Sequence, residues 1–362
     1  MTPSVVRTRV TELLRCRYPV LLPGMSWISK PELVAAVCNA GGCGILATGP
    51  LTADETREAI HEIRKQTNKT FGIGATLLMP GAVENAQVAL EEKVPLINVS
   101  LGKADWIAKE IHSYGGTLLA TVTTARHAHA AMESGADALM VTGYEAAAHG
   151  SDVGSMTLIP SMAQEFPNVP LIAAGGIANG QGLAAALSLG ADGVAMGSRL
   201  AVSEESSLSQ NAKEAICLGT VSDTVYGSNF DGIPARVLKT PFSEKLMDRP
   251  TALPIVAWRA LEAASTFGIP VWKVLPGLLT QWSKLYAVAQ FGAATKVLQR
   301  ATVDGDLEKG VQFVGQSQGV IRDIASVEET MQQIIKQATE ASASTARYFA
   351  EDDHQLLEDD YA

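Results

Sequence analysis

The stretch 171-LIAAGGIANGQGLAAALSLGADGVAMGSR-199 carries the clearest indication of the fold class, because it shows one full repeat of a pattern that recurs along the chain. The apolar runs LIAA and GVA each lead into a glycine-containing turn, as buried strands of a parallel sheet do. Between them, the alanine- and leucine-rich segment 180–190 is typical of a helix, and its final glycine suits the left-handed position after a helix. The stretch predicts strand, helix and strand.

The same alternation extends back to Pro19. Amphipathic segments such as 30–41, 52–68 and 124–135 separate short apolar runs, and the candidate strands are 19–25, 44–49, 71–77, 96–101, 117–123, 138–143, 171–176 and 193–198. An open doubly wound sheet also alternates strands and helices. Eight units at this spacing favour closure, so we expect an α/β protein with a (β/α)8 TIM barrel.

After Arg199 the alternation stops. Residues 206–309 are helix-like and contain several prolines, which predicts a smaller, mainly helical cap domain. The barrel then comprises residues 1–205 and is completed by 310–362, where a last helix over 327–344 is expected to pack back on it.

Composition and charge exclude several classes of function. The formal net charge is −10, and an acidic surface repels the phosphate backbone of nucleic acids. No apolar run reaches the roughly 18 residues of a membrane span, and the first residues do not resemble a signal peptide. We therefore expect a soluble, cytoplasmic protein with a small-molecule substrate, and neither a nucleic-acid nor a membrane partner.

Two familiar motifs are set aside. GCGILA, residues 42–47, matches the dinucleotide fingerprint, but it follows a predicted helix and opens a strand, the reverse of the order that this motif requires. The four cysteines show no zinc-binding spacing, and Cys38 and Cys43 are interpreted as small buried thiols. No metal site is predicted.

Phosphate binding is predicted at the ends of the last two strands. Gly175 and Gly176 end the seventh predicted strand, and Gly197 and Ser198 end the eighth. Glycine lets the backbone approach an anion closely and leaves its amides free, and barrels often bind phosphate at these two strands. Tight barrel turns are the alternative interpretation of each pair; the two pairs together favour a phosphate cradle.

His149 is the candidate acid or base. It lies in TGYEAAAHGS, residues 142–151, just after the sixth predicted strand and therefore at the face where barrel enzymes place their chemistry. A histidine that only satisfies loop backbone groups is the alternative. His127 and His129 are two positions apart on a predicted helix and cannot share a metal there.

Four segments together resemble the nitronate monooxygenase family and its relatives, the FMN-dependent enoyl-acyl-carrier-protein reductases and NADH:quinone reductases. They are GMSWISKPELVAAVCNAGGCGILATG (24–49), GYEAAAHG (143–150), the stretch 171–199 and GIPARVLKTP (232–241). The resemblance implies a barrel that holds non-covalent FMN under a helical cap.

The same resemblance implies roles for individual residues. His149 corresponds to the catalytic histidine, and Gly24 and Met25 to residues beside the flavin ring. Thr142 and Ala147 stand at flavin-site positions where many relatives have Gln and Gly, and alanine can replace glycine where φ is negative. The remaining cofactor positions are the phosphate-site residues Gly175, Gly176, Ala195, Met196, Gly197 and Ser198, together with Gln316.

The resemblance leads to three hypotheses about function. The leading one is an FMN-dependent monooxygenase that oxidises alkyl nitronates with O2 to a carbonyl compound and nitrite. The second is an NAD(P)H-dependent FMN reductase that acts on a quinone or an enoyl thioester. The third is a flavin-binding protein without catalytic activity. A barrel like that of IMP dehydrogenase would need a cysteine after the sixth strand, where this chain has none.

Overall fold

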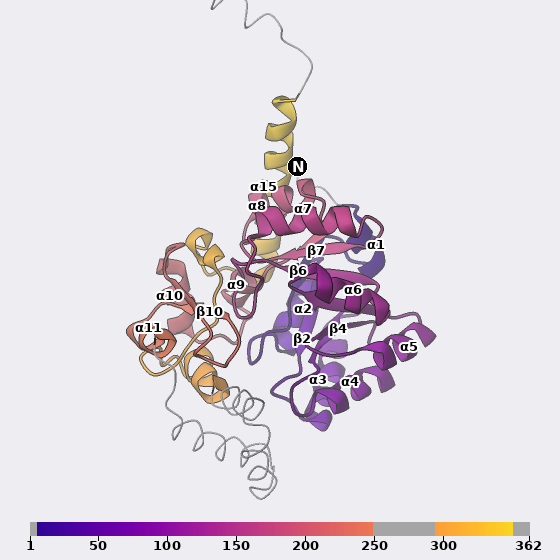
Figure 1. The fold of residues 1–362 in the computed structure, drawn as a ribbon, viewed down its shortest axis with the longest axis horizontal. Helices are drawn as coiled ribbons and strands as arrows, with labels where there is room; N and C mark the ends of the chain where they lie inside the picture. Colours follow the sequence, from indigo (N-terminus) through magenta and orange to yellow (C-terminus); the bar gives the residue numbers. More distant parts are fainter. Residues whose placement is uncertain (1–5, 249–293, 350–362) are drawn as a thin grey trace, which may run out of the picture.

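The computed structural model describes residues 6–248 and 294–349 (Figure 1). Within these ranges, eight parallel strands close into a barrel in sequence order, and Leu21 of β1 pairs with both Cys43 of β2 and Ala195 of β8. The predicted TIM barrel is confirmed. Its strands are β1 (Val20–Leu22), β2 (Cys43–Ala47), β3 (Gly72–Thr76), β4 (Leu96–Ser100), β5 (Thr117–Val122), β6 (Ala138–Thr142), β7 (Leu171–Ala174) and β8 (Gly193–Ala195).

Helices alternate with these strands and surround the barrel (Figure 1). Helix α3 illustrates how they begin: the Thr52 hydroxyl accepts from the Glu55 amide, while the Glu55 carboxylate accepts from the Thr52 amide. Ile60 and Ile63 then bury one face of this helix. The helices are α2 (Pro31–Asn39), α3 (Ala53–Gln66), α4 (Ala82–Glu91), α5 (Asp105–Ser113), α6 (Ala125–Glu133), α7 (Ser155–Glu165), α8 (Gly180–Ser188) and the short α9 (Gly197–Ala201).

Two apolar clusters hold this architecture together. The larger one joins the surrounding helices to the strands. The smaller one contains side chains at alternate strand positions, such as Cys43 and Ile45 of β2, and includes Val10 and Leu14 of the N-terminal helix α1 (Arg9–Leu14). Alternation along the strands separates the two clusters, because successive side chains point to opposite faces.

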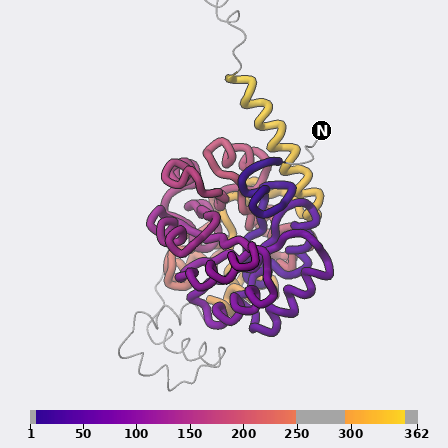
Figure 2. Tube along the Cα trace, turned by 90° about the vertical axis from the view of Figure 1, so that its right-hand side faces the viewer, coloured from indigo at the N-terminus to yellow at the C-terminus, as the bar shows by residue number. Residues whose placement is uncertain are grey.

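The last helix, α15 (Val327–Arg347), packs against α8 and α2, as the sequence predicts for residues 327–344. Its buried face contains Met331, Ile334 and Ile335. The side-chain oxygen Oε1 of Gln337 also accepts a hydrogen bond of 3.0 Å from the first amide of α8, at Gly180. The C-terminal part of α15 extends beyond the barrel (Figure 2).

Residues 206–309 contain a sheet in addition to the expected helices. Helix α10 (Gln210–Leu218) is followed by the antiparallel strands β9 (Thr224–Gly227) and β10 (Ala235–Leu238), and then by α11 (Pro241–Asp248). Phe230, Val237 and Val311 form a small core of their own with neighbouring apolar side chains. Residues 249–293 of the predicted cap lie outside the described residues, and the domain boundaries stay a prediction.

Beyond the predicted cap, the 3-10 helix η1 (Gln316–Val320) leads the chain back to the barrel. None of the described helices combines the length and apolar character that crossing a bilayer requires.

Candidate active site

A cavity of about 1820 Å3 lies at the carboxyl ends of the barrel strands, the face where TIM barrels bind their substrates. It also reaches residues of the predicted cap, among them Tyr226 and Pro234. The structure brings most of the predicted site residues together here. Those that line the cavity are Gly24, Met25, Thr142, Ala147, His149, Gly175, Gly176, Ala195, Gly197 and Ser198.

The two predicted cofactor residues that do not line the cavity are Met196 and Gln316. The Met196 side chain is fully buried in the larger apolar cluster, and its amide donates to the carbonyl of Leu21 as part of the strand ladder. The Gln316 amide donates to the carbonyl of Glu145. Met196 therefore has no donor left for a cofactor, and the neighbours of Gln316, Gly315 and Ser317, reach the cavity in its place.

The turn after β7 is a cradle that requires glycine. Gly175 and Gly176 have φ values of +98° and +78°, a region that residues with a Cβ rarely adopt. A Cβ on Gly175 would also lie 3.0 Å from the amide nitrogen of Ala146. Space and backbone conformation thus both depend on glycine at this wall of the cavity.

The hydrogen-bond donors around this cradle match the needs of a phosphate group. The amides of Gly176, Gly197 and Ser198 donate to no other described residue. The Ser198 hydroxyl oxygen accepts from the Gly315 amide at 3.0 Å, which leaves its hydrogen for another acceptor. Free amides and a hydroxyl on residues that line one cavity are typical of an anion site, so the residues present fit the phosphate of FMN.

The loop after β6 is fixed by the carboxylate of Glu145, for which no local sequence pattern gives a signal. Both oxygens of Glu145 lie 3.0 Å from the Ser155 amide, and Oε2 lies 2.8 Å from the Ser155 hydroxyl. The same hydroxyl is 3.1 Å from the carbonyl of Gly175. Glu145 therefore links the histidine loop to the start of α7 and to the glycine cradle.

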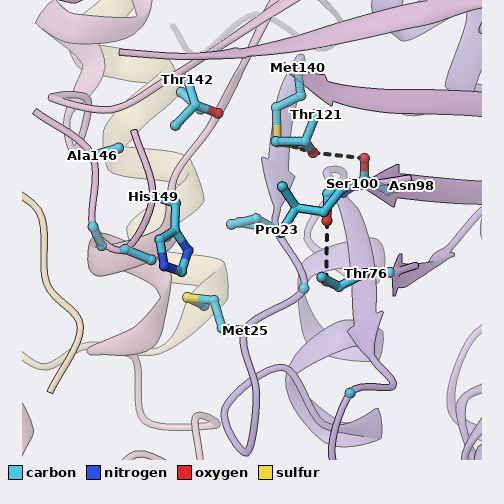
Figure 3. A pocket seen from close by; sticks show the side chains of 18 of the residues that line it. Pro23, Met25, Thr76, Asn98, Ser100, Thr121, Met140, Thr142, Ala146 and His149 are labelled. Carbon is cyan, nitrogen blue, oxygen red and sulfur yellow. Dashed lines mark hydrogen bonds between the residues drawn. The ribbon is translucent and has the colours of Figure 1, made fainter. Parts of the chain in front are cut away.

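His149 faces the cavity from this loop, beside Met25 (Figure 3). Its Nε2 atom lies 2.8 Å from Oδ2 of Asp231, which is in the connection between β9 and β10. The side chain of Asp231 is 2% exposed, whereas that of His149 is 26% exposed. The pair thus joins a buried carboxylate to an imidazole that is open to the cavity.

The opposite wall of the cavity is polar (Figure 3). The Thr121 hydroxyl donates to Oδ1 of Asn98 at 3.0 Å, and the Ser100 hydroxyl donates to Oγ1 of Thr76 at 3.2 Å. These side chains come from the ends of β3, β4 and β5. A ligand between the two walls would meet neutral hydroxyl and amide groups on one side and His149 on the other.

A buried arginine supports the histidine loop from the side of the hairpin. Arg236 is 2% exposed, and its guanidinium donates to the carbonyl of Tyr144 at 3.0 Å and to the hydroxyl of Thr224 at 2.9 Å. It also lies over the rings of Tyr144 and Tyr226, at 4.5 and 5.1 Å from their centroids. Burial, with a contribution from Tyr144, raises the pKa of Tyr226, so its phenol stays protonated at neutral pH.

The sequence profile of the family described as nitronate monooxygenase matches residues 7–92 and 81–337 of this chain. The chain belongs to the nitronate monooxygenase family. The matched residues include the glycine cradle, the histidine loop and the described part of the predicted cap. Membership of this family makes the chain an oxidoreductase.

Proteins similar to this chain are named for different activities. A Mycobacterium tuberculosis protein named (3aS,4S,5R,7aS)-5-hydroxy-7a-methyl-1-oxo-octahydro-1H-indene-4-carboxyl-CoA dehydrogenase is 34% identical over 92% of this chain and 96% of its own length. A probable nitronate monooxygenase of Staphylococcus saprophyticus is 29% identical over 68% of this chain and 82% of its own. The chain is similar to both.

Solved structures agree with the fold. FabK from Thermotoga maritima is 35% identical, with a TM-score of 0.78 over 96% of this chain and 100% of FabK. A nitroalkane oxidase from Streptomyces ansochromogenes has a TM-score of 0.77 over 93% of this chain and 99% of its own, but at 22% identity it shows the fold alone.

The cysteines of this nitronate monooxygenase family member are poor candidates for the chemistry. Cys38 and Cys43 are buried, as predicted, and none of the four lines the cavity. Burial raises the pKa of Cys16 to about 12 and that of Cys38 to about 11, so both are neutral thiols at physiological pH.

Proposed function

We propose that this protein is an FMN-dependent oxidoreductase that exchanges a hydride between the cofactor and an acyl thioester, and a proton between the thioester and His149. The observation that carries the proposal is that His149, beside Met25, and the glycine cradle line one cavity. The glycine cradle and Ser198 would hold the phosphate of FMN, and His149 lines the same cavity.

A thioester substrate is favoured over a nitronate because this chain matches the CoA dehydrogenases over more of its length than it matches a probable nitronate monooxygenase. The CoA dehydrogenases of M. tuberculosis and Rhodococcus jostii each match this chain over 92% of its length, at 34% and 31% identity. The probable nitronate monooxygenase of S. saprophyticus matches 68% of it, at 29% identity. The size of the cavity, about 1820 Å3, accommodates a flavin together with an extended acyl group.

In this proposal His149 handles the proton. The carbonyl of a thioester acidifies the hydrogen on its α-carbon, and an imidazole can accept that proton near neutral pH. When bound, FMN supplies the two-electron chemistry by accepting the hydride from the β-carbon, or by delivering it in the reverse direction. Loss of one proton and one hydride converts the saturated acyl group to the enoyl group, and gain of both reverses the reaction.

The other residues bind and orient. Asn98 and Thr121 present an amide and a hydroxyl on the wall opposite His149, where they can hydrogen-bond a carbonyl or a ring edge. Gly24 and Met25 line the cavity just after the end of β1. The positions of Thr142 and Ala147 in the same cavity support their proposed contacts with the cofactor.

Nitronate oxidation is the second candidate, and the match to the nitronate monooxygenase profile favours it. There a protonated His149 would stabilise the anionic nitronate, or the neutral imidazole would deprotonate a nitroalkane next to its nitro group. The two candidates therefore share the histidine and the cofactor and differ in the compound that is oxidised.

The test combines cofactor identification with anaerobic reduction. Flavin released from the denatured protein should co-elute with FMN on chromatography. We then expect NADH or NADPH to bleach the flavin absorbance and crotonyl-CoA to restore it, or a saturated acyl-CoA to bleach it directly. Bleaching by an alkyl nitronate alone would transfer the assignment to the second candidate. A protein that releases no flavin would contradict both.

A further inference from the structure

We infer that Asp231 is a positioning residue that selects Nδ1 of His149 as the nitrogen that exchanges a proton with the substrate. The inference rests on the proposed role of His149 as the acid or base. Asp231 belongs to the predicted cap and lies 82 positions after His149 in the sequence. The cap would therefore contribute a residue to a reaction whose other proposed residues come from the barrel.

The first step is the direction of the hydrogen bond. An ionised carboxylate only accepts hydrogen bonds, so the 2.8 Å contact between Oδ2 of Asp231 and Nε2 of His149 requires the hydrogen to be on Nε2. In the neutral ring the lone pair is then on Nδ1. Among the described residues, Nδ1 of His149 has no hydrogen-bond partner, and it is not a buried unpaired atom.

The second step is the balance of charge. When Nδ1 takes a proton, both ring nitrogens carry hydrogen and the imidazolium faces a carboxylate that is 2% exposed. The carboxylate is poorly solvated by water and close enough to compensate the new positive charge. Asp231 itself does not line the cavity, so it acts on the substrate through His149.

The third step is how Asp231 is held. Its second oxygen, Oδ1, accepts a hydrogen bond of 3.1 Å from the amide of Ile233 within the same turn. One oxygen therefore shapes the turn between β9 and β10, and the other orients the imidazole. The hairpin is fixed to the histidine loop by the backbone bridge between Ala148 and Arg236.

This division between the two oxygens makes Asp231→Asn a clean probe. The Asn carbonyl can still accept from the Ile233 amide, while its NH2 group replaces Oδ2 and faces Nε2. An NH2 group donates, so it favours the ring with its hydrogen on Nδ1 and its lone pair on Nε2. We expect kcat to fall about 100-fold or more, as when the wrong tautomer is imposed on a catalytic histidine, with little change in KM or FMN affinity.

Asp231→Ala and Asp223→Asn are the comparison variants. The alanine variant leaves the ring free to adopt either tautomer, so its kcat should exceed that of Asp231→Asn. Asp223 is also a capping carboxylate near the hairpin, with Oδ2 bound to the amide and hydroxyl of Thr220, but it is outside the cavity. Asp223→Asn should therefore have the kcat of the native protein. It serves as the control for the purely structural effect of removing a carboxylate from a turn.

Two further readouts separate this inference from the proposed function. In a His149→Ala background, Asp231→Asn should cause no additional loss of kcat, because its effect passes through the ring. Nitrogen-15 shifts of His149, assigned by difference from His149→Ala, should show hydrogen on Nε2 in the native protein and on Nδ1 in Asp231→Asn.

Unchanged activity in His149→Ala would overturn the proposed role of the histidine. Impaired activity in His149→Ala with native kcat and native tautomer in Asp231→Asn would overturn the inference about Asp231 alone. Equal additional losses caused by Asp231→Asn in both backgrounds would also contradict it, because they would show an effect that does not pass through the histidine.

Discussion

Ala148 and Arg236 exchange two backbone hydrogen bonds, of 3.1 and 3.0 Å, that join the loop after β6 to strand β10. Ala148 has a φ of +54°, so alanine stands here in the left-handed region that favours glycine. The condition under which alanine replaces glycine without strain, a negative φ, is therefore not met at Ala148, and the bridge to Arg236 holds the unfavourable conformation. His149 is the next residue, so the bridge sets the direction of its side chain.

Replacing Arg236 by Met should destabilise the protein and lower its turnover. The change removes the donors to the Tyr144 carbonyl and the Thr224 hydroxyl and the cation over two aromatic rings, a loss of about 2–4 kcal/mol in the free energy of unfolding. Urea unfolding measures the first effect and steady-state kinetics the second. Arg126→Met, on the exposed face of α6, is the control and should remain within about 0.5 kcal/mol of the native protein.

His149→Ala should abolish most of the turnover and retain the flavin. Loss of a positioned acid or base lowers kcat by about 100- to 10 000-fold, whereas the glycine cradle that we assign to the FMN phosphate is unchanged. Stopped-flow reduction and the flavin content of the purified variant are the measurements. His129→Gln is the matched control, since that exposed histidine contacts Glu165 on the surface. Equal turnover in the two variants would rule out the role of His149.

Gly175→Ala should lower the affinity for FMN. Gly190→Ala is the matched control, because Gly190 has the same φ of +98° as Gly175. A Cβ on Gly190 would also be crowded, at 2.8 Å from the Cβ of Ala163, but Gly190 lies outside the cavity. Both substitutions should destabilise the chain by about 1–2 kcal/mol through the left-handed backbone. In a fluorescence titration of the apoprotein with FMN, weaker binding is expected for Gly175→Ala and native binding for Gly190→Ala.

Glu92 should make stability depend on acid pH. Burial alone would raise the pKa of its carboxyl. Hydrogen bonds from Arg57, His61 and Arg64, together with the charge of His61, outweigh the effect of burial and hold the pKa below its usual value. A lowered pKa in the folded state stabilises the protein above the unfolded-state pKa, and this stabilisation is lost as the pH falls through the folded-state value.

The measurement is urea unfolding of the native protein and of Glu92→Gln at pH 7 and near pH 3. The variant should be less stable at pH 7, and the difference should shrink in acid. Glu91→Gln removes a more exposed carboxylate that contacts Arg57, and its pH-dependent difference should be smaller. A Glu92→Gln difference that stays constant between the two pH values would contradict the assignment.

Local patterns were sufficient for the barrel and for bringing most of the candidate site residues to one cavity. Each strand is a buried apolar run that ends in small residues, so counting the runs predicted both the closed sheet and the face where Gly175, Ser198 and His149 meet. The amide of Met196 points into the strand ladder rather than into the cavity, and residue type does not distinguish these two cases at the end of a strand.

The partner of His149 could not be predicted in the same way. Asp231 is 82 residues away, and its contact depends on how the hairpin packs against the loop after β6. A local signal for the hairpin itself was present: the run of turn-forming residues in 227-GSNFDG-232 separates Thr224–Gly227 from Ala235–Leu238, both rich in residues that favour strands. The helix-like character of residues 206–309 as a whole directed the interpretation toward helices.

Helix α15 has a consequence for biosynthesis. Because its Met331, Ile334 and Ile335 fill the space beside α8 and α2, the apolar surface of those helices stays uncovered until residues beyond 335 have emerged from the ribosome. A nascent chain in which all eight barrel strands have been synthesised would therefore still expose the apolar surface of α8 and α2 to other chains. Complete burial of this surface therefore requires translation of the residues that form α15.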